Sequence, residues 1–399
     1  MTEKTNIQQG YKDSPLGIIP KEWEVKRLGD FCISFSGGTP RSGTPSYYNG
    51  TIPFIRSGEI NQDKTELFLS QEGLDNSSAK LVKKGDILYA LYGANSGQCS
   101  LSKINGVINQ AILCIRPNAH PYFLMSVLQL NKNHYYNSYL QGGQGNLSGE
   151  IVSNYKIALP STEEQERICS VLQLWDTAIE KQSKLIEKLK LCKRALMQQL
   201  LTVKKRLPGF SGEWKEVKLG DIFDERNEIN RDDLPLLSIT GDKGVIYQSE
   251  SDKRDISNDD KSKYKRICPN DIGYNTMRMW QGRSALSNIE GIVSPAYTIV
   301  TPHKNVDVRF MAMLIQQPRI IYDFWTHSQG LVSDTLNCKY PDFCQVKVRI
   351  PSKEEQTAIA DLLYEFDKEI DLANEKLANL QSQKRGLMQQ LLTGKKRII

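Results

Sequence analysis

The chain has 399 residues, of which 39% are hydrophobic and 25% charged, and its formal net charge is +6. This length is generous for one hydrophobic core and comfortable for two domains of ordinary size. No stretch approaches the ~20 consecutive apolar residues that span a membrane, and the first residues are polar where a signal peptide is apolar. We therefore expect a cytoplasmic protein, and the mildly basic balance permits nucleic-acid binding without requiring it.

The cysteines and histidines argue against a metal centre. Eight cysteines are scattered along the chain, and the four histidines do not cluster with them. A zinc site needs Cys and His residues at short, regular spacings. We therefore expect reduced cysteines that act as small apolar residues, with no metal and no cofactor bound to this chain.

Residues 1–158 are predicted to form a first globular domain of mixed α/β structure. Strand-like apolar runs occur at 51–55, 86–92 and 112–115, with turns rich in Gly, Ser and Asn between them. A helix is predicted near 121–130.

A long helix is predicted within residues 159–206. Pro160 disfavours helix in the residue before it, and Ser161 followed by Glu164 forms the pattern of a capping box. Apolar residues then recur at alternating spacings of four and three from Ile168 to Leu200, which is the seam of a coiled coil. Lys193 interrupts this seam, either to fix the register of the pairing or to pack its stem while its charged head reaches water.

The rest of the chain repeats this plan. Residues 207–349 are predicted to form a second α/β domain, with a strand at 297–300 and a helix near 308–317. Residues 350–399 are predicted to form a second long coiled-coil helix, with Ser352 and Glu355 at its start and Lys384 interrupting its seam.

The repeat is exact in spacing. Pro-Ser-Thr-Glu-Glu-Gln at 160–165 returns as Pro-Ser-Lys-Glu-Glu-Gln at 351–356, and Leu-Met-Gln-Gln-Leu-Leu-Thr at 196–202 returns at 387–393. Trp23 and Trp214 are separated by the same 191 positions, as are Leu-Gly-Asp at 28–30 and 219–221. We predict two α/β recognition domains joined by two antiparallel coiled-coil helices, with an internal pseudo-twofold repeat. The ~150 residues between the seams allow the helices to pair within one chain, and pairing between two chains is the alternative.

Motifs for catalysis are missing from the sequence. It contains no Pro-Pro of the kind found in the base-holding turn of amino-methyltransferases, and no phosphate-binding Gly-x-x-x-x-Gly-Lys-Ser/Thr loop. Hydrolase and zinc-protease signatures are also lacking. We therefore expect a chain that is not itself an enzyme.

Taken together, the repeated motifs resemble the DNA-specificity subunit of a type I restriction-modification system over nearly the whole length. The paired helix motifs are the most specific part. They are supported by Leu-Gly-Asp at the start of each domain, by Gly-Asp-Ile-Leu at 85–88 with Gly-Val-Ile-Asn-Gln-Ala at 106–111, and by 275–282 with 291–297. The resemblance implies two target-recognition domains that each read one half of a split DNA sequence. It also implies a helix pair that sets the spacing and docks the methyltransferase subunits, of which we expect two, while restriction and translocation belong to further subunits.

Candidate DNA contacts follow from side-chain chemistry, because Arg can donate two hydrogen bonds to guanine, Asn or Gln can pair with adenine, and Lys, Ser and Tyr can hold phosphates. In the first domain the candidates are Arg41, Tyr47, Tyr48, Asn49, Arg56, Ser57, Gln98, Gln144 and Asn146. In the second they are Arg226, Asn227, Arg231, Lys261, Lys263, Arg278, Gln281 and Arg283.

Each group has a structural alternative. In the structural alternative, Tyr47 and Tyr48 only pack and Arg56 pairs with Glu59. Lys261 and Lys263 lie either along a strand face toward phosphates or on a solvated edge. For the chain as a whole, the alternative is a coiled-coil protein–protein scaffold that does not read DNA sequence. A salt-dependent preference for particular duplexes separates the two functions.

Overall fold

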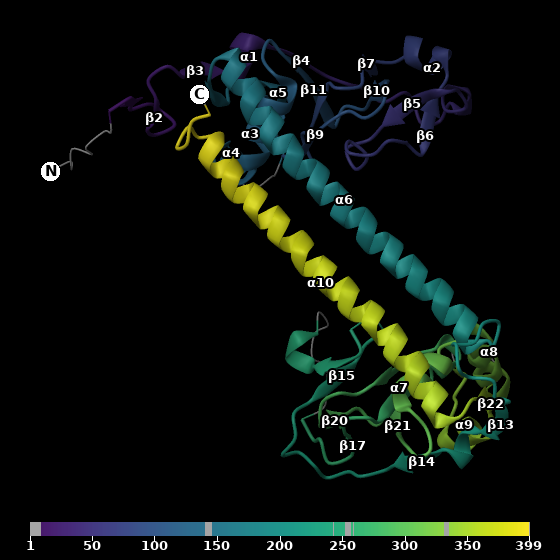
Figure 1. The fold of residues 1–399 in the computed structure, drawn as a ribbon. Coiled ribbons are helices and arrows are strands. Elements are labelled where there is room, and N and C mark those ends of the chain that lie inside the picture. The colour runs from purple at the N-terminus through teal and green to yellow at the C-terminus, as the bar shows by residue number, and fades with distance from the viewer. Residues whose placement is uncertain are drawn as a thin grey trace. The chain divides into compact units, whose positions relative to one another are not determined.

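The computed structural model describes residues 9–139, 146–241, 243–251, 257, 259–330 and 335–398. The chain divides into two compact units: unit 1 comprises Met1–Ser183 with Glu375–Ile399, and unit 2 comprises Lys184–Asn374. Both boundaries fall inside long helices, α6 (Thr162–Leu201) and α10 (Lys353–Leu391). Each unit therefore contains one globular part and one segment of each long helix (Figure 1).

The globular part of unit 1 is built on two four-stranded sheets. Its strands are β1 (Tyr11–Lys12), β2 (Ile19–Pro20), β3 (Glu24–Arg27), β4 (Cys32–Ser36), β5 (Ile52–Ile55), β6 (Leu67–Leu69), β7 (Lys80–Val82), β8 (Ile87–Ala90), β9 (Cys99–Leu101), β10 (Gly106–Ile108), β11 (Ile112–Pro117) and β12 (Lys156–Leu159). One sheet has the order β4-β11-β8-β9 and is antiparallel throughout, and the other has the order β6-β5-β10-β7 with β5 and β10 parallel. Two ribbons, β1-β2 and β12-β3, complete the strand pairing among the described residues.

Short helices cover these sheets. They are α1 (Leu28–Phe31), α2 (Gln71–Asp75), α3 (Pro121–Leu130), α4 (Lys132–Tyr139) and α5 (Gly149–Ser153), with a 3-10 turn η1 (Pro45–Tyr47). The predicted strands at 51–55, 86–92 and 112–115 are confirmed as β5, β8 and β11, and the helix predicted near 121–130 is α3.

Unit 2 repeats part of this topology. Its strands are β13 (Lys215–Lys218), β14 (Phe223–Arg226), β15 (Leu237–Ile239), β16 (Val245–Tyr247), β17 (Lys265–Ile267), β18 (Ile272–Asn275), β19 (Ser284–Leu286), β20 (Gly291–Val293), β21 (Tyr297–Pro302) and β22 (Lys347–Ile350). Its helices and 3-10 turns are η2 (Leu219–Asp221), η3 (Gln248–Glu250), η4 (Met279–Gln281), α7 (Val308–Leu314), α8 (Pro318–His327) and α9 (Tyr340–Gln345). The antiparallel sheet β14-β21-β18-β19 corresponds to β4-β11-β8-β9, and the ribbon β13-β22 corresponds to β12-β3. The strand predicted at 297–300 is confirmed as part of β21, and the helix predicted near 308–317 is α7.

The core of each unit is completed by the end of a long helix. In unit 1, Leu391 and Leu392 pack in the same buried cluster as Trp23, which is fully buried. In unit 2, Leu200 and Leu201 pack in the cluster that contains Trp214. The repeated Leu-Met-Gln-Gln-Leu-Leu segment at the end of each long helix therefore contributes to the core of a globular part.

The repeated Glu-Glu-Gln motif locks the tail that follows each long helix. In unit 2 the guanidinium of Arg206 donates two hydrogen bonds of 2.6 Å to the buried carboxylate of Glu355. In unit 1 Arg397 donates to Glu164 in the same way, and Trp23 Nε1 donates to that carboxylate as well. We name the pair Arg206–Glu355 and its counterpart Arg397–Glu164 the tail locks.

Of the capping box predicted at the start of α6, the structure confirms the Ser161 half and contradicts the Glu164 half. Ser161 Oγ accepts the backbone N–H of Glu164, as expected for an N-cap. The carboxylate of Glu164, however, turns to Arg397 and Trp23 instead of reaching back along its own helix. A buried carboxylate gains more from a guanidinium than from one backbone N–H, because both partners are charged.

The adjacent glutamine joins each long helix to its globular part. Gln165 donates to the carbonyl of Pro160 and accepts the backbone N–H of His120, at the start of α3. Gln356 donates to Pro351 and accepts from Asp307, at the start of α7. The glutamine of the repeated motif thus makes the same tertiary contacts in both units.

The two lysines that interrupt the seams form ion pairs between the helices. In unit 1 Lys384 of α10 pairs with Asp176 of α6, and in unit 2 Lys193 of α6 pairs with Asp367 of α10. The lysine side chains are only 15% and 22% exposed. They are held by a partner rather than extended into water, as the register-fixing alternative requires.

Candidate DNA interface

The segment 278–283, which contains three of the candidates of unit 2, lies between β18 and β19. A compact turn holds it: Arg278 N–H donates to the carbonyl of Asn275, and Asn275 N–H donates to the carbonyl of Arg283. Gly282 adopts a φ of +75°, where an L side chain would be strained. The turn places the two arginines at the ends of neighbouring antiparallel strands.

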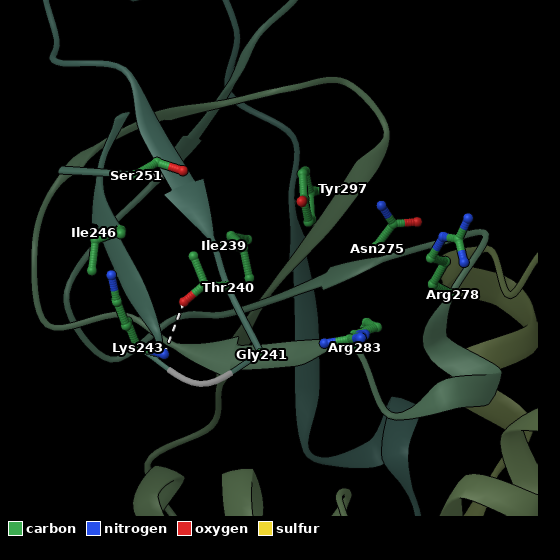
Figure 2. A pocket seen from close by; sticks show the side chains of 10 residues that line it. All are labelled: Ile239, Thr240, Gly241, Lys243, Ile246, Ser251, Asn275, Arg278, Arg283 and Tyr297. Atoms are coloured by element: carbon green, nitrogen blue, oxygen red, sulfur yellow. Dashed lines mark hydrogen bonds between the residues drawn. The ribbon is translucent and has the colours of Figure 1, made fainter. Parts of the chain in front are cut away.

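These arginines border a hollow of about 550 Å³. Its lining residues are Ile239, Thr240, Gly241, Lys243, Ile246, Ser251, Asn275, Arg278, Arg283 and Tyr297. Figure 2 shows Lys243 and Ile246 on one side of it and Asn275 and Arg278 on the other. Among the described residues, the charged side chains of the lining are all basic: Lys243, Arg278 and Arg283. The hollow is therefore suited to an anionic ligand with polar edges.

The two arginines keep most of their donors available. Arg278 makes one hydrogen bond, of 3.3 Å, to Gln281 on the same turn. Arg283 is exposed, and no side-chain hydrogen bond joins it to another described residue. Its guanidinium lies against Gly241, where a Cβ atom would approach Nη1 to 2.2 Å. A larger side chain at 241 would push the guanidinium out of this position.

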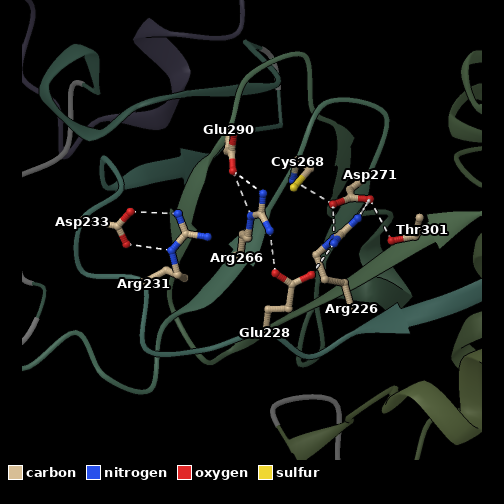
Figure 3. Close-up of polar contacts among 9 residues, drawn as sticks. All are labelled: Arg226, Glu228, Arg231, Asp233, Arg266, Cys268, Asp271, Glu290 and Thr301. Carbon is tan, nitrogen blue, oxygen red and sulfur yellow. Dashed lines mark hydrogen bonds and ion pairs between the residues drawn. The ribbon is translucent and has the colours of Figure 1, made fainter.

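The other arginines predicted in unit 2 are held by carboxylates (Figure 3). Arg226 donates to Asp271, whose side chain is 1% exposed, and also pairs with Glu228. Arg231 donates two hydrogen bonds to Asp233. The bonds to Asp271 and Glu228 raise the pKa of Arg226 above its ordinary value. These guanidinium groups would have to exchange an internal partner for a base or phosphate.

The remaining candidates of unit 2 lie at the surface. Asn227 and Gln281 are exposed, and Lys263 is exposed in the turn that precedes β17. Lys261 donates to Ser257 and lies over the ring of Tyr264. The sequence allowed these lysines to alternate along a strand, but β17 begins at Lys265, so Lys261 and Lys263 belong to the turn before it.

In unit 1 the aromatic candidates are partly structural. The hydroxyl of Tyr48 donates to the carbonyl of Pro40, and its ring packs edge-on against Phe54. The carbonyl of Tyr47 accepts the N–H of Ser70. Both rings are half-buried, whereas Asn49 beside them is exposed. This matches the packing alternative for the two tyrosines.

Arg56 also follows its structural alternative. It donates to Glu59, which is 6% exposed, and forms an ion pair with Glu66. The bonds to Glu59 and Glu66 raise its pKa further above the ordinary arginine value. Ser57 next to it is half-buried.

Besides Asn49, three candidates of unit 1 are exposed in the described ranges: Arg41, Gln98 and Asn146. Gln98 stands directly before β9, and it borders a hollow of about 300 Å³ with Asn61 and Lys132. No side-chain hydrogen bond joins Arg41 or Gln98 to another described residue. Gln144 lies outside the described residues.

Sequence reasoning missed several residues of the unit 2 hollow. Thr240 and Lys243 line it from the turn between β15 and β16, a segment with no motif in the sequence. Asn275 and Tyr297 occur in the motif segments 275–282 and 291–297, which was a usable signal for their position. The motif alone, however, could not distinguish a residue at the hollow from one in the core.

The repeated Asp before β8 and β18 also has a structural role that the sequence did not reveal. Asp86 accepts from Arg116 on β11, and its counterpart Asp271 accepts from Arg226 and from Thr301 on β21. Burial alone would raise the pKa of Asp86, but the bonds from Arg116 and from the N–H of Lys83 outweigh it, and the pKa lies below its ordinary value. These carboxylates tie the starts of β8 and β18 to neighbouring strands, whereas Gln98, Arg278 and Arg283 lie beside the opposite ends of β8 and β18.

Two further findings bear on the kind of site. Within the described ranges, the helices are too polar or too short to cross a membrane. In the same ranges, no three His, Cys, Asp or Glu side chains converge in a way that could hold a metal ion.

Comparison with known proteins gives a consistent result at the level of family and fold. The family model for the type I restriction modification DNA specificity domain matches residues 20–191 and again 211–382. The chain is 24% identical to the type I restriction enzyme MjaVIII specificity subunit of Methanocaldococcus jannaschii, with 98% of each chain covered. It is also 24% identical to the EcoR124I/EcoR124II specificity subunit of Escherichia coli, over 42% of this chain and 44% of that one.

Solved structures share the fold at low sequence identity. The crystal structure of the S subunit of a type I restriction-modification system from M. genitalium superposes with a TM-score of 0.56 at 15% identity, covering 98% of this chain and 99% of that one. A chain from a structural study of complex assembly and conformational transition in the type I system gives a TM-score of 0.59 at 17% identity, covering 95% and 99%. With two matched domains that together span most of its length, the chain belongs to the family of type I restriction-modification DNA specificity proteins.

Proposed function

We propose that this chain is the sequence-reading subunit of a type I restriction-modification enzyme, and that each unit recognises one half of a bipartite DNA target. The observation that carries the proposal is the duplication: the same specificity-domain model matches the chain twice, at 20–191 and 211–382. A reader that occurs twice in one chain, with the same antiparallel four-stranded sheet in each unit, suits a target made of two short recognised segments.

In unit 2 we propose that recognition centres on the hollow bordered by Arg278 and Arg283. Their uncommitted donors suit the O6 and N7 acceptors of guanine in the major groove. Lys243 at the same hollow suits a phosphate contact, which positions the protein without reading sequence. Arg226 is paired with the buried Asp271 and Arg231 with the exposed Asp233, so we assign both to the local fold rather than to base contacts.

In unit 1 we propose Arg41, Gln98, Asn49 and Asn146 as the stronger candidates for DNA contact, because their side chains are exposed. Gln144 stays a prediction beside them. Tyr48 and Arg56 support the fold of this surface through their contacts with Pro40 and Glu59.

We further propose that α6 and α10 pair as an antiparallel coiled coil that sets the distance between the half-sites. The contacts within each unit support this direction: Asp176 of α6 meets Lys384, and Glu164, earlier in α6, meets Arg397, beyond the end of α10. In unit 2, Lys193 of α6 meets Asp367 of α10, and Arg206, later in the chain than Lys193, meets Glu355, which is earlier in α10. The corresponding domain limits would be 1–158 and 207–349 for the readers, and 159–206 and 350–399 for the helices.

The partners we propose are two methyltransferase subunits and the restriction and translocase subunits, with double-stranded DNA as the ligand. Exposed leucines on the long helices support docking of other helices: Leu174, Leu185, Leu191 and Leu372 are between 47% and 71% exposed. Apolar side chains of this size on a polar helix face are common in protein interfaces. Methyl transfer and cleavage would take place on the partners, with this chain as a non-catalytic guide in the cytoplasm.

The test is binding and modification by the chain assembled with its methyltransferase partner. We expect the complex to shift duplex DNA with an affinity that falls steeply with salt, because phosphate contacts release counterions. We also expect one bipartite motif to be methylated in the source genome, and the modification to disappear when the gene is deleted. Binding without any sequence preference, and methylation unaffected by deletion, would instead favour the protein–protein scaffold.

A further inference from the structure

The sheets β4-β11-β8-β9 and β14-β21-β18-β19 place two of the candidate readers at the same structural position. Gln98 directly precedes the edge strand β9, and Arg283 directly precedes the edge strand β19. The carbonyl of Gln98 accepts the N–H of Ala90 at 2.8 Å, and the carbonyl of Arg283 accepts the N–H of Asn275 at 3.0 Å. Ala90 and Asn275 are the last residues of the neighbouring strands β8 and β18.

A second pair of hydrogen bonds fixes the same register. Gln129 of α3 donates from Nε2 to the carbonyl of Cys99 at 3.0 Å. Gln316, just after α7, donates from Nε2 to the carbonyl of Ser284 at 3.0 Å. Because Cys99 follows Gln98 and Ser284 follows Arg283, the two positions are equivalent in the backbone of both units.

Both side chains are exposed, and no side-chain hydrogen bond ties either one to another described residue. Each has a lysine at its own hollow, which is Lys132 for Gln98 and Lys243 for Arg283. A cation there can hold a phosphate while the uncommitted side chain reaches a base edge. The side chain differs between the units, whereas the backbone that presents it is the same.

We propose that this position determines base identity once in each half of the target, so that Gln98 selects an adenine and Arg283 selects a guanine. The proposal rests on the proposed function, since it needs each unit to read one half-site. Its chemical basis is the pairing of Gln with the N6 and N7 atoms of adenine, and of Arg with the O6 and N7 atoms of guanine. The remaining candidates then contribute other bases or phosphates around these two fixed points.

The test exchanges the glutamine and arginine side chains at these two positions in the full complex. Variants Gln98→Arg and Arg283→Gln are assembled with the methyltransferase subunits, and the methylated motif of each is mapped on a random-sequence DNA library. We expect Gln98→Arg to change one adenine of the first half-site to guanine, and Arg283→Gln to make the opposite change in the second. Preference for the original base should fall by roughly 10- to 100-fold, the range of a good bidentate contact, and the other half-site should be unaffected.

Alanine variants and matched controls protect the test against simple loss of activity. Gln98→Ala and Arg283→Ala should each relax one position without creating a new preference. Gln173→Arg on α6 and Arg319→Gln on α8 make the same chemical changes at exposed sites away from the two strands, and the motif should be unchanged.

The outcomes separate this inference from the proposed function. An unchanged motif in both swap variants overturns the inference while leaving the bipartite reader intact. A change at several positions or in both half-sites also overturns it, because it indicates a structural role, as does loss of all modification by the alanine variants in complexes that still assemble. If the wild-type complex itself yields no bipartite motif, the proposed function fails.

Discussion

Replacing Arg206 by alanine removes the partner of a carboxylate that folding has withdrawn from water. The Glu355 side chain is 3% exposed and that of Arg206 is 25% exposed. Breaking a buried ion pair costs about 3–5 kcal/mol, because the remaining charge is left without compensation. Since a quarter of Arg206 still touches water, we expect the lower end of this range, about 3 kcal/mol, at neutral pH.

The assay is urea unfolding followed by circular dichroism and tryptophan fluorescence. Trp214 borders the same hollow as Arg206 and should report the change in unit 2. With a urea slope of about 3 kcal/mol/M, the midpoint of this unit should fall by about 1 M. Lys205→Ala is the matched control, since Lys205 is the exposed neighbour, and it should change the free energy of unfolding by less than about 0.5 kcal/mol.

A double-mutant cycle isolates the pair itself. In a Glu355→Gln background, Arg206→Ala should cost much less, because a neutral amide does not leave a buried charge behind. In unit 1, Arg397→Ala should cost less than Arg206→Ala, because Trp23 continues to donate to Glu164. The reasoning is refuted if Arg206→Ala destabilises no more than Lys205→Ala, or if the two substitutions of the cycle are simply additive.

Three other predictions follow from single sites. Gly394 has a φ of +71°, and a Cβ atom there would approach Cδ of Pro20 to 2.4 Å. Gly394→Ala should therefore lower the unfolding free energy of unit 1 by about 1–3 kcal/mol in urea titrations. An unchanged urea midpoint would contradict this. The ion-paired carboxylates of Asp86 and Asp307 have lowered pKa values despite burial. The stability that they contribute should therefore be present above about pH 4 and be lost as the pH falls through the depressed pKa. Urea midpoints should fall between pH 7 and pH 3, and a rise would contradict the prediction. Cys192 is the exposed one of the eight cysteines, so a thiol reagent should modify it first in the native protein and reach the buried Cys99, Cys114, Cys169 and Cys338 only on unfolding. Labelling of any of these four before unfolding would contradict their burial.

The repeat and the long helices were accessible from the sequence because their signals are periodic and local. The seam residues predicted two helices, and α6 and α10 begin at Thr162 and Lys353, within a few residues of the Pro-Ser motifs. Start signals act over three or four residues, so pattern alone locates them. The second role of the helix ends, as core under Trp23 and Trp214, needs the tertiary structure.

The roles of individual arginines were not accessible in the same way. Arg226 and Arg283 are both candidates from the sequence, but Arg226 is bound to Asp271, which is 45 positions away. Arg206 and Glu355 are 149 positions apart, although each belongs to a repeated motif. An ion pair between distant residues depends on the fold, so only the structure separates arginines that support the surface from those that remain available to a ligand.

The central claim is that two readers, set apart by the paired helices, recognise one duplex at a fixed spacing. Four residues inserted between Asp176 and Lys193 in α6, and four between Asp367 and Lys384 in α10, should lengthen the pair by ~6 Å. At ~3.4 Å per base pair, the methylated motif should keep both half-sites and gain one or two unread base pairs between them. An insertion in α6 alone serves as the control, since it would mismatch the ion pairs and impair assembly. Methylation by the double-insertion variant at the original spacing would contradict the account.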